Sequence, residues 1–396
     1  MMEPAGTGQP APRAFLRVGG ATLARHQLGI ALALECQRVI CVARDVTQPI
    51  IALQHEAERA GVRLHVIPGP RALAGLVTAN DELVVFTEGL LAAPQEAVGL
   101  LEAGHSVLVQ PIESGLAAGF ERIDLNHAAA GAIRIPGRLV DGLADLPPDC
   151  DIPSALTRIA LQSGIAMQTV PAAAREGARW KLVRDEVEAH AIEGAWIRLH
   201  MGEGEMPTPG ILLSRLGILA LGPSLLHAGS GGGLVALGAL AVMLLALAAG
   251  WLGYASMALL LCAAAWTLRR ASGLLERVEH DSLNLRKSGL SSEQVLGWLL
   301  DIELIALIAW STPLPEWETV LSRVFPPFML LVLTRFLPRV LLRGWIAWLE
   351  DRALLALLLA LAAVFGVLVP AVQVLTMLLA LAALLLSAGK SQLTRV

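Results

Sequence analysis

Long apolar runs after residue 233 constrain this chain more than any other feature. Hydrophobic residues make up 55% of its 396 residues, and the mean hydropathy is +0.62. A helix needs about 20 apolar residues to cross a bilayer. We therefore predict an all-α transmembrane bundle over residues 233–396, with six spanning helices at 234–251, 253–268, 294–310, 320–337, 353–369 and 371–387.

Basic residues between these runs predict the orientation. They gather in the linker after the second run, in the loop after the fourth and in the tail, at Arg269, Arg270, Arg277, Arg286, Lys287, Arg339, Arg343, Arg352, Lys390 and Arg395. Basic loops stay on the cytoplasmic side of a membrane. The first twelve residues are polar and do not resemble a signal peptide. We expect both termini in the cytoplasm and a location in a bacterial inner (cytoplasmic) membrane.

Residues 1–201 have a different pattern, in which short β-branched runs alternate with helical spacing. Strands are predicted at 38–43, 63–67, 82–87, 106–110, 120–125 and 132–135, with helices at 21–37, 49–60, 71–79, 93–103, 153–164 and 183–199. This alternation predicts a soluble α/β domain of the Rossmann type with a parallel sheet. Residues 202–232 are predicted to be a linker that contains an interfacial amphipathic helix at 211–226.

Composition also removes some classes of function. The net charge of −4 and the pI near 6.2 do not indicate a nucleic-acid partner. Four cysteines lack the spacing of a zinc site and are expected to be reduced, packed thiols.

Residues 15–28, FLRVGGATLARHQL, resemble a segment of sugar-nucleotide and cytidylyl transferases (GT-A type). The resemblance implies a nucleotidyltransferase-like domain with a vestigial nucleotide site at Gly19 and Gly20. It places Glu88 and Asp185 near the positions of the two metal-binding aspartates of that family.

Residues 268–305 resemble the site of CDP-alcohol phosphatidyltransferases. The family pattern is Asp-x-x-Asp-Gly-x-x-Ala-Arg, eight residues, then Gly-x-x-x-Asp-x-x-x-Asp. Gly273 and Arg277 match its first half, and Gly297 and Asp301 match its second half across a longer gap. With the N-terminal domain, this order is similar to that of bifunctional enzymes of inositol-phospholipid synthesis.

The resemblance implies a site for a CDP-linked alcohol and for Mg²⁺ or Mn²⁺. Gly273, Arg277 and Gly297 would contact CDP, Asp301 and Glu303 would bind metal, and Asp301 would be the catalytic residue. Arg269, Ser272 and Ile305, however, stand where the pattern has its other three aspartates.

Acids inside an apolar segment mark functional sites or pair with buried cations, so two roles remain open for Asp301. It binds a metal, or it forms an ion pair with Arg269 or Arg277. The corresponding function is a divergent, active or inactive CDP-alcohol phosphatidyltransferase of phospholipid synthesis. Its expected partners are membrane lipid and a second copy or an active paralogue. The alternatives are a transporter, a scaffold or regulatory partner subunit, and a plain membrane anchor.

Overall fold

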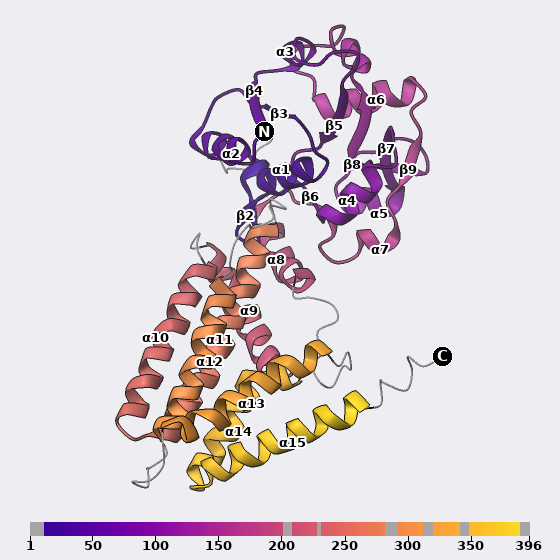
Figure 1. Cartoon of the computed structure of the whole chain (residues 1–396). Helices are drawn as coiled ribbons and strands as arrows, with labels where there is room; N and C mark the ends of the chain where they lie inside the picture. The colour runs from indigo at the N-terminus through magenta and orange to yellow at the C-terminus, as the bar shows by residue number, and fades with distance from the viewer. Residues whose placement is uncertain are drawn as a thin grey trace. The chain divides into compact units, whose positions relative to one another are not determined.

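The computed structural model describes residues 12–200, 208–227, 231–281, 292–311, 320–340 and 348–388. The chain divides into two units, one of residues 1–200 with 277–286 and one of residues 201–276 with 287–396. A mixed α/β region is followed by a mostly helical part (Figure 1).

A four-stranded sheet forms the centre of the first unit, in the order β5 (Glu82–Phe86), β8 (His127–Pro136), β7 (Ser106–Pro111), β9 (Met167–Thr169). Strand β8 is antiparallel to both of its neighbours, while β7 and β9 are parallel. Three further pairs complete the strands: parallel β3 (Arg38–Val42) with β4 (Arg63–Ile67), and antiparallel β1 (Arg17–Val18) with β2 (Ala21–Thr22) and β6 (Leu90–Ala92) with β10 (Trp180–Leu182).

The expectation of a parallel sheet is therefore wrong for β8, and residues 120–125 do not form the predicted strand. They form a turn whose only ladder contact is an isolated bridge from Arg122 to Ala128. The Asp124 carboxylate accepts the backbone N–H groups of Asn126 and His127, both at 2.7 Å, and this turn reverses the chain into β8. Alternating hydrophobicity predicts a strand but not its direction, because that direction depends on such turns.

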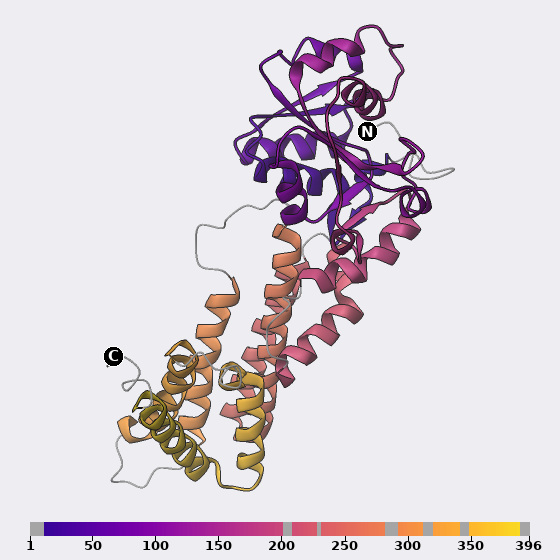
Figure 2. The same ribbon diagram turned by 90° about the vertical axis from the view of Figure 1, so that its right-hand side faces the viewer.

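Helices cover both faces of the strands, as Figure 2 shows from the side. Ala128, Ala130 and Ala132 of β8 pack toward α1 (Leu23–Ala33) and α4 (Pro94–Leu101). Ile133 and Ile135 pack on the other face, toward α6 (Ile152–Gln162). The remaining helices are η1 (Arg13–Phe15), α2 (Gln48–Arg59), α3 (Pro70–Ala74), α5 (Ile112–Ala117), η2 (Gly137–Leu143), α7 (Ala172–Arg175) and α8 (Glu186–His200).

The second unit consists of α9 (Pro209–His227), α10 (Gly231–Trp251), α11 (Ala255–Asp281), α12 (Ser292–Trp310), α13 (Val320–Val340), α14 (Arg352–Val364) and α15 (Leu368–Ala388). Within the described ranges, four of these helices are long and apolar enough to cross a membrane: α10, α11, α13 and α15. At about 1.5 Å per residue, the 21 residues of α10 span about 32 Å, which matches a hydrocarbon layer of about 30 Å.

Three predicted segments differ from these helices. The predicted span at 294–310 forms α12, but α12 is not among the four, because it carries Glu293, Asp301 and Glu303. The predicted span at 353–369 ends early, because α14 stops at Val364 and Gly366 adopts a left-handed φ of 69° before α15 begins. The predicted helix at 211–226 forms as α9, but it is not amphipathic. Gly210, Ser214 and Ile218 face the bundle, while the outward face is also apolar, at Leu212, Leu213, Leu216 and Leu219.

Candidate functional site

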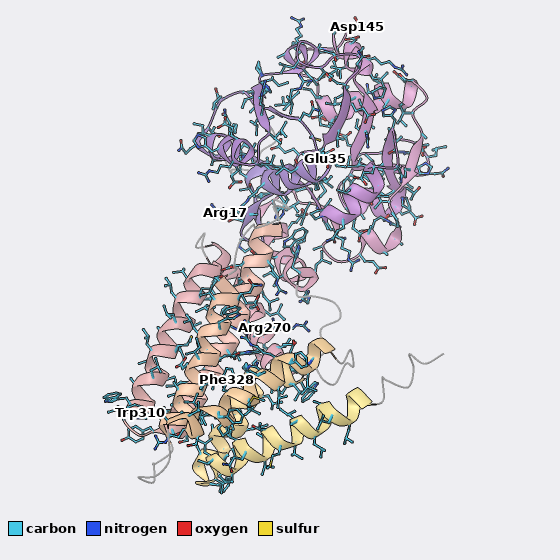
Figure 3. The ribbon with its side chains drawn as sticks, viewed as in Figure 1. Arg17, Glu35, Asp145, Arg270, Trp310 and Phe328 are labelled. Carbon is cyan, nitrogen blue, oxygen red and sulfur yellow. The ribbon has the colours of Figure 1, made fainter. Side chains whose placement is uncertain are left out.

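Six charged side chains from four helices meet in the second unit, and we call them the charged cluster. They are Arg269 and Arg270 of α11, Glu293 and Asp301 of α12, Arg335 of α13 and Arg352 of α14. Arg269 connects the two halves of the cluster, since it lies within electrostatic range of both Asp301 and Arg352. Figure 3 shows Arg270 within this bundle.

Asp301 lies between two arginines. Its Oδ2 is 2.6 Å from Nε of Arg335, and its Oδ1 accepts a hydrogen bond from Nε of Arg352 at 3.0 Å. Only 13% of the Asp301 side chain is exposed. Asp301 therefore forms the expected ion pair, but with Arg335 and Arg352 instead of Arg269 or Arg277.

The start of α14 holds Arg352 in place. Arg352 donates a further hydrogen bond to the carbonyl of Leu349 at 3.0 Å. The neighbouring Asp351 is buried and caps α14, because its Oδ1 accepts the N–H groups of Ala353 and Leu354. Its Oδ2 accepts the N–H of Gly210 at 2.8 Å, which ties α9 to the same end of α14.

Glu293 is the second anion of the cluster. Its Oε1 lies 3.0 Å from Arg270 Nη1 and 3.7 Å from Arg269 Nη1. Arg269 also donates to the backbone carbonyl of Glu293 at 2.9 Å. The ring of Trp266 lies 5.5 and 5.7 Å from the two guanidinium carbons, a cation–π distance.

The two glycines of the family pattern provide room for this ion pairing. A side chain at Gly273 would clash with the Glu293 carboxylate, and one at Gly297 would approach Arg269 Nη1 at 3.0 Å. Each helix therefore has a glycine opposite the charged side chain of the other, which lets α11 and α12 approach closely. Arg277 is exposed further along α11.

The positions without the family's aspartates also have local roles. The hydroxyl of Ser272 is buried and donates to the carbonyl of Arg269 at 2.9 Å, within its own helix. Ile305 packs against the apolar core of the bundle.

The carboxylates of α12 do not converge on one point. Glu303 is buried next to the Cys262 thiol, while Asp301 is bound by two arginines. In the described part of the chain no three His, Cys, Asp or Glu side chains form a group that could hold a metal ion. Because Mg²⁺ takes several oxygen ligands, these residues do not fit the implied Mg²⁺ or Mn²⁺.

An aromatic pair marks one end of the helices of the second unit. Trp251 and Trp310 stack at 5.2 Å at one end of the bundle, where tryptophans commonly mark a membrane surface (Figure 3). Asp301 is nine residues from Trp310, about 14 Å along α12.

In the first unit, the Gly19–Gly20 turn joins β1 to β2 with φ values of 62° and 80°. The N–H of Gly19 donates to Oε1 of Glu193, a buried residue of α8, at 3.2 Å. A side chain at Gly19 would meet the ring of Trp196 at 2.6 Å. A carboxylate of the chain itself thus occupies the N–H that a nucleotide loop would offer to phosphate.

Glu88 and Asp185 are held by backbone groups. Oε1 of Glu88 accepts the N–H of Ala14 at 3.2 Å, and Oδ1 of Asp185 accepts the N–H of Glu188 at 2.8 Å at the start of α8. These contacts give each acid a local structural role.

All four cysteines are free; Cys41 and Cys262 are buried, as expected, whereas Cys36 and Cys150 are partly exposed. Burial raises the pKa of the Cys41 thiol to about 11, so this thiol stays protonated and unreactive at neutral pH.

Reasoning from the sequence did not connect Asp301 to Arg335 and Arg352. Arg335 had a signal, because it interrupts the apolar run at 320–337, whereas Arg352 was counted only as a loop charge that sets orientation. No protein-family model matches the chain, and comparison with curated proteins gives no match.

Proposed function

We propose that this chain is a non-catalytic membrane relative of the CDP-alcohol phosphatidyltransferases that binds an anionic, phosphate-bearing lipid or CDP-linked headgroup at the charged cluster. The observation that carries the proposal is the position of Asp301, held between Arg335 and Arg352. A carboxylate whose charge is balanced by two arginines stabilises the structure and is not available as a metal ligand or a base.

The arginines of the cluster support an anionic ligand. Four of its six side chains are arginines, from three different helices. Several guanidinium groups in one place can bind an anion together. A guanidinium group also matches the geometry of phosphate oxygens.

The same residues argue against transfer chemistry. The family pattern needs carboxylates at positions that here hold Arg269, Ser272 and Ile305. A cation at a metal-ligand position would repel the metal. We therefore place the chain in phospholipid head-group synthesis as a binding or regulatory subunit beside an active enzyme.

One experiment tests binding and activity together. Protein purified in detergent is given radiolabelled CDP-diacylglycerol, with Mg²⁺ or Mn²⁺ and with candidate alcohols that include inositol phosphate. We expect no release of CMP but saturable binding of the labelled lipid. Arg270→Gln should weaken that binding roughly tenfold, as expected for loss of a charge-assisted hydrogen bond.

Two variants are the controls. Arg71→Gln removes an exposed arginine of α3 and should bind as the wild type does. Asp301→Asn should release no CMP, and neither should the wild type. Release of CMP by the wild type that Asp301→Asn abolishes would overturn the proposal, as would the absence of any lipid binding.

A further inference from the structure

The first unit contains a cavity of about 220 Å³ on the face of the sheet that α6 covers. It lies beside β8, where Ala129 and Gly131 are small, while Ile133 and Ile135 further along the strand fill the core. One water needs only about 10–15 Å³ of such space, so this hollow can hold a small organic molecule.

The residues that line the cavity differ in polarity. Val85, Val107 and Ile133 of the sheet are apolar, and we call them the floor, whereas three arginines also line the cavity: Arg13, Arg122 and Arg158. This arrangement, an apolar surface with a few converging polar groups, is typical of a small-molecule site.

The two acidic residues that line the cavity, Glu121 and Asp151, already accept hydrogen bonds from Ser154. Glu121 Oε2 accepts the Ser154 hydroxyl at 2.7 Å, and Asp151 Oδ2 accepts the Ser154 N–H at 3.0 Å as the cap of α6. Neither forms an ion pair with Arg122 or Arg158 within the described ranges.

Two of the arginines keep donors available. Arg122 uses only its Nε, which donates to the carbonyl of Asp124 at 2.9 Å. Arg158 makes no hydrogen bond or ion pair with any residue that the structure describes. A guanidinium has five N–H donors, so both side chains can still bind an anion.

We propose that this cavity binds a small organic phosphate, with the phosphate held by Arg122 and Arg158 and the organic group over the apolar floor. The cavity is distinct from the Gly19–Gly20 turn and from the charged cluster. The proposal is therefore independent of the function proposed above.

Equilibrium dialysis of the full-length protein in detergent tests this site, with radiolabelled glycerol 3-phosphate as the probe. We expect saturable binding that Arg122→Gln and Arg158→Gln each weaken roughly tenfold, because each removes a charge-assisted hydrogen bond. Both side chains are exposed, so the variants should fold, which circular dichroism checks.

The matched control is Arg71→Gln, which removes another exposed arginine away from the cavity and should leave binding unchanged. Unlabelled glycerol 3-phosphate should displace the probe better than inorganic phosphate does, since only the former reaches the floor. The site is disproved by an absence of saturable binding, by an equal loss in Arg71→Gln, or by equal displacement by inorganic phosphate.

Discussion

At the scale of single residues, the burial of Asp301 decides how the charged cluster behaves. Side chains of Asp301 and Arg352 are 13% and 6% exposed, so water screens their attraction poorly. Two functions that the sequence leaves open for Asp301, metal ligand and ion-pair partner, require different surroundings. The contacts with Arg335 and Arg352 favour the second.

We predict that the pair is coupled in stability. Asp301→Asn leaves Arg352 buried without its anion and should lower the free energy of unfolding by about 3–5 kcal/mol. Arg352→Gln should cost a similar amount. The double variant should cost clearly less than the sum, because neither partner is then left alone. Thermal unfolding in detergent measures all three.

Glu350→Gln is the control for this series, since Glu350 is exposed beside the same helix start and should change stability little. Additive losses in the double variant would show that Asp301 and Arg352 do not stabilise each other.

At the scale of elements, a glycine lets α9 pack closely against the neighbouring helices of the second unit. Gly210 of α9 lies against Asp351, Trp266 and Ala353, where a side chain would come within 2.5 Å of both Asp351 Oδ1 and the Trp266 ring. Gly217, in the same helix, has no atom within 4 Å of the place a side chain would take.

These two glycines give a matched prediction. Gly210→Ala should destabilise the protein by about 1–3 kcal/mol, because the added methyl forces α9 away from the cap of α14. Gly217→Ala should be neutral or stabilising by up to about 1 kcal/mol, because alanine favours a helix. Denaturant unfolding monitored by tryptophan fluorescence compares the two. Equal effects would mean that α9 does not pack on α14 as described.

The elements also show which helices and strands a local sequence pattern can predict. Apolar spacing correctly indicated α1, α2, α4, α6 and α8, and β3, β4, β5, β7 and β8. It missed the short strands β1, β2, β6, β9 and β10, which have two or three residues each and gain their stability from non-local partners. The apolar spacing also could not predict that β8 runs antiparallel to its neighbours.

At the scale of the whole molecule, the four long apolar helices suggest a membrane location. Their exposed side chains are mostly aliphatic; in α15 these include Val374, Met377, Leu378, Leu381 and Leu384. Exposed apolar surfaces of this kind mark sites of contact with lipid or with a protein partner. The aromatic end with Trp251, Tyr254 and Trp310 and the arginine-rich end of α11 would then lie at opposite membrane surfaces.

Labelling of intact cells tests this orientation. We expect Tyr254→Cys, exposed between α10 and α11, to react with a membrane-impermeant maleimide from outside the cell. Arg71→Cys, in the first unit, should react only after the membrane is permeabilised. The unsubstituted protein corrects for its own cysteines. Labelling of Arg71→Cys in intact cells would contradict the positive-inside orientation.

The sequence by itself determined which parts of this chain are apolar helices and which form an α/β region, because both follow from local periodicity and length. It also located the unusual charges, Arg269, Asp301 and Glu303, since charge within an apolar run is visible without a fold. Only the tertiary structure decided which two cations Asp301 contacts and that Glu193 accepts the Gly19 N–H. Those partners are 34, 51 and 174 residues away along the chain, and packing alone brings such distant groups together.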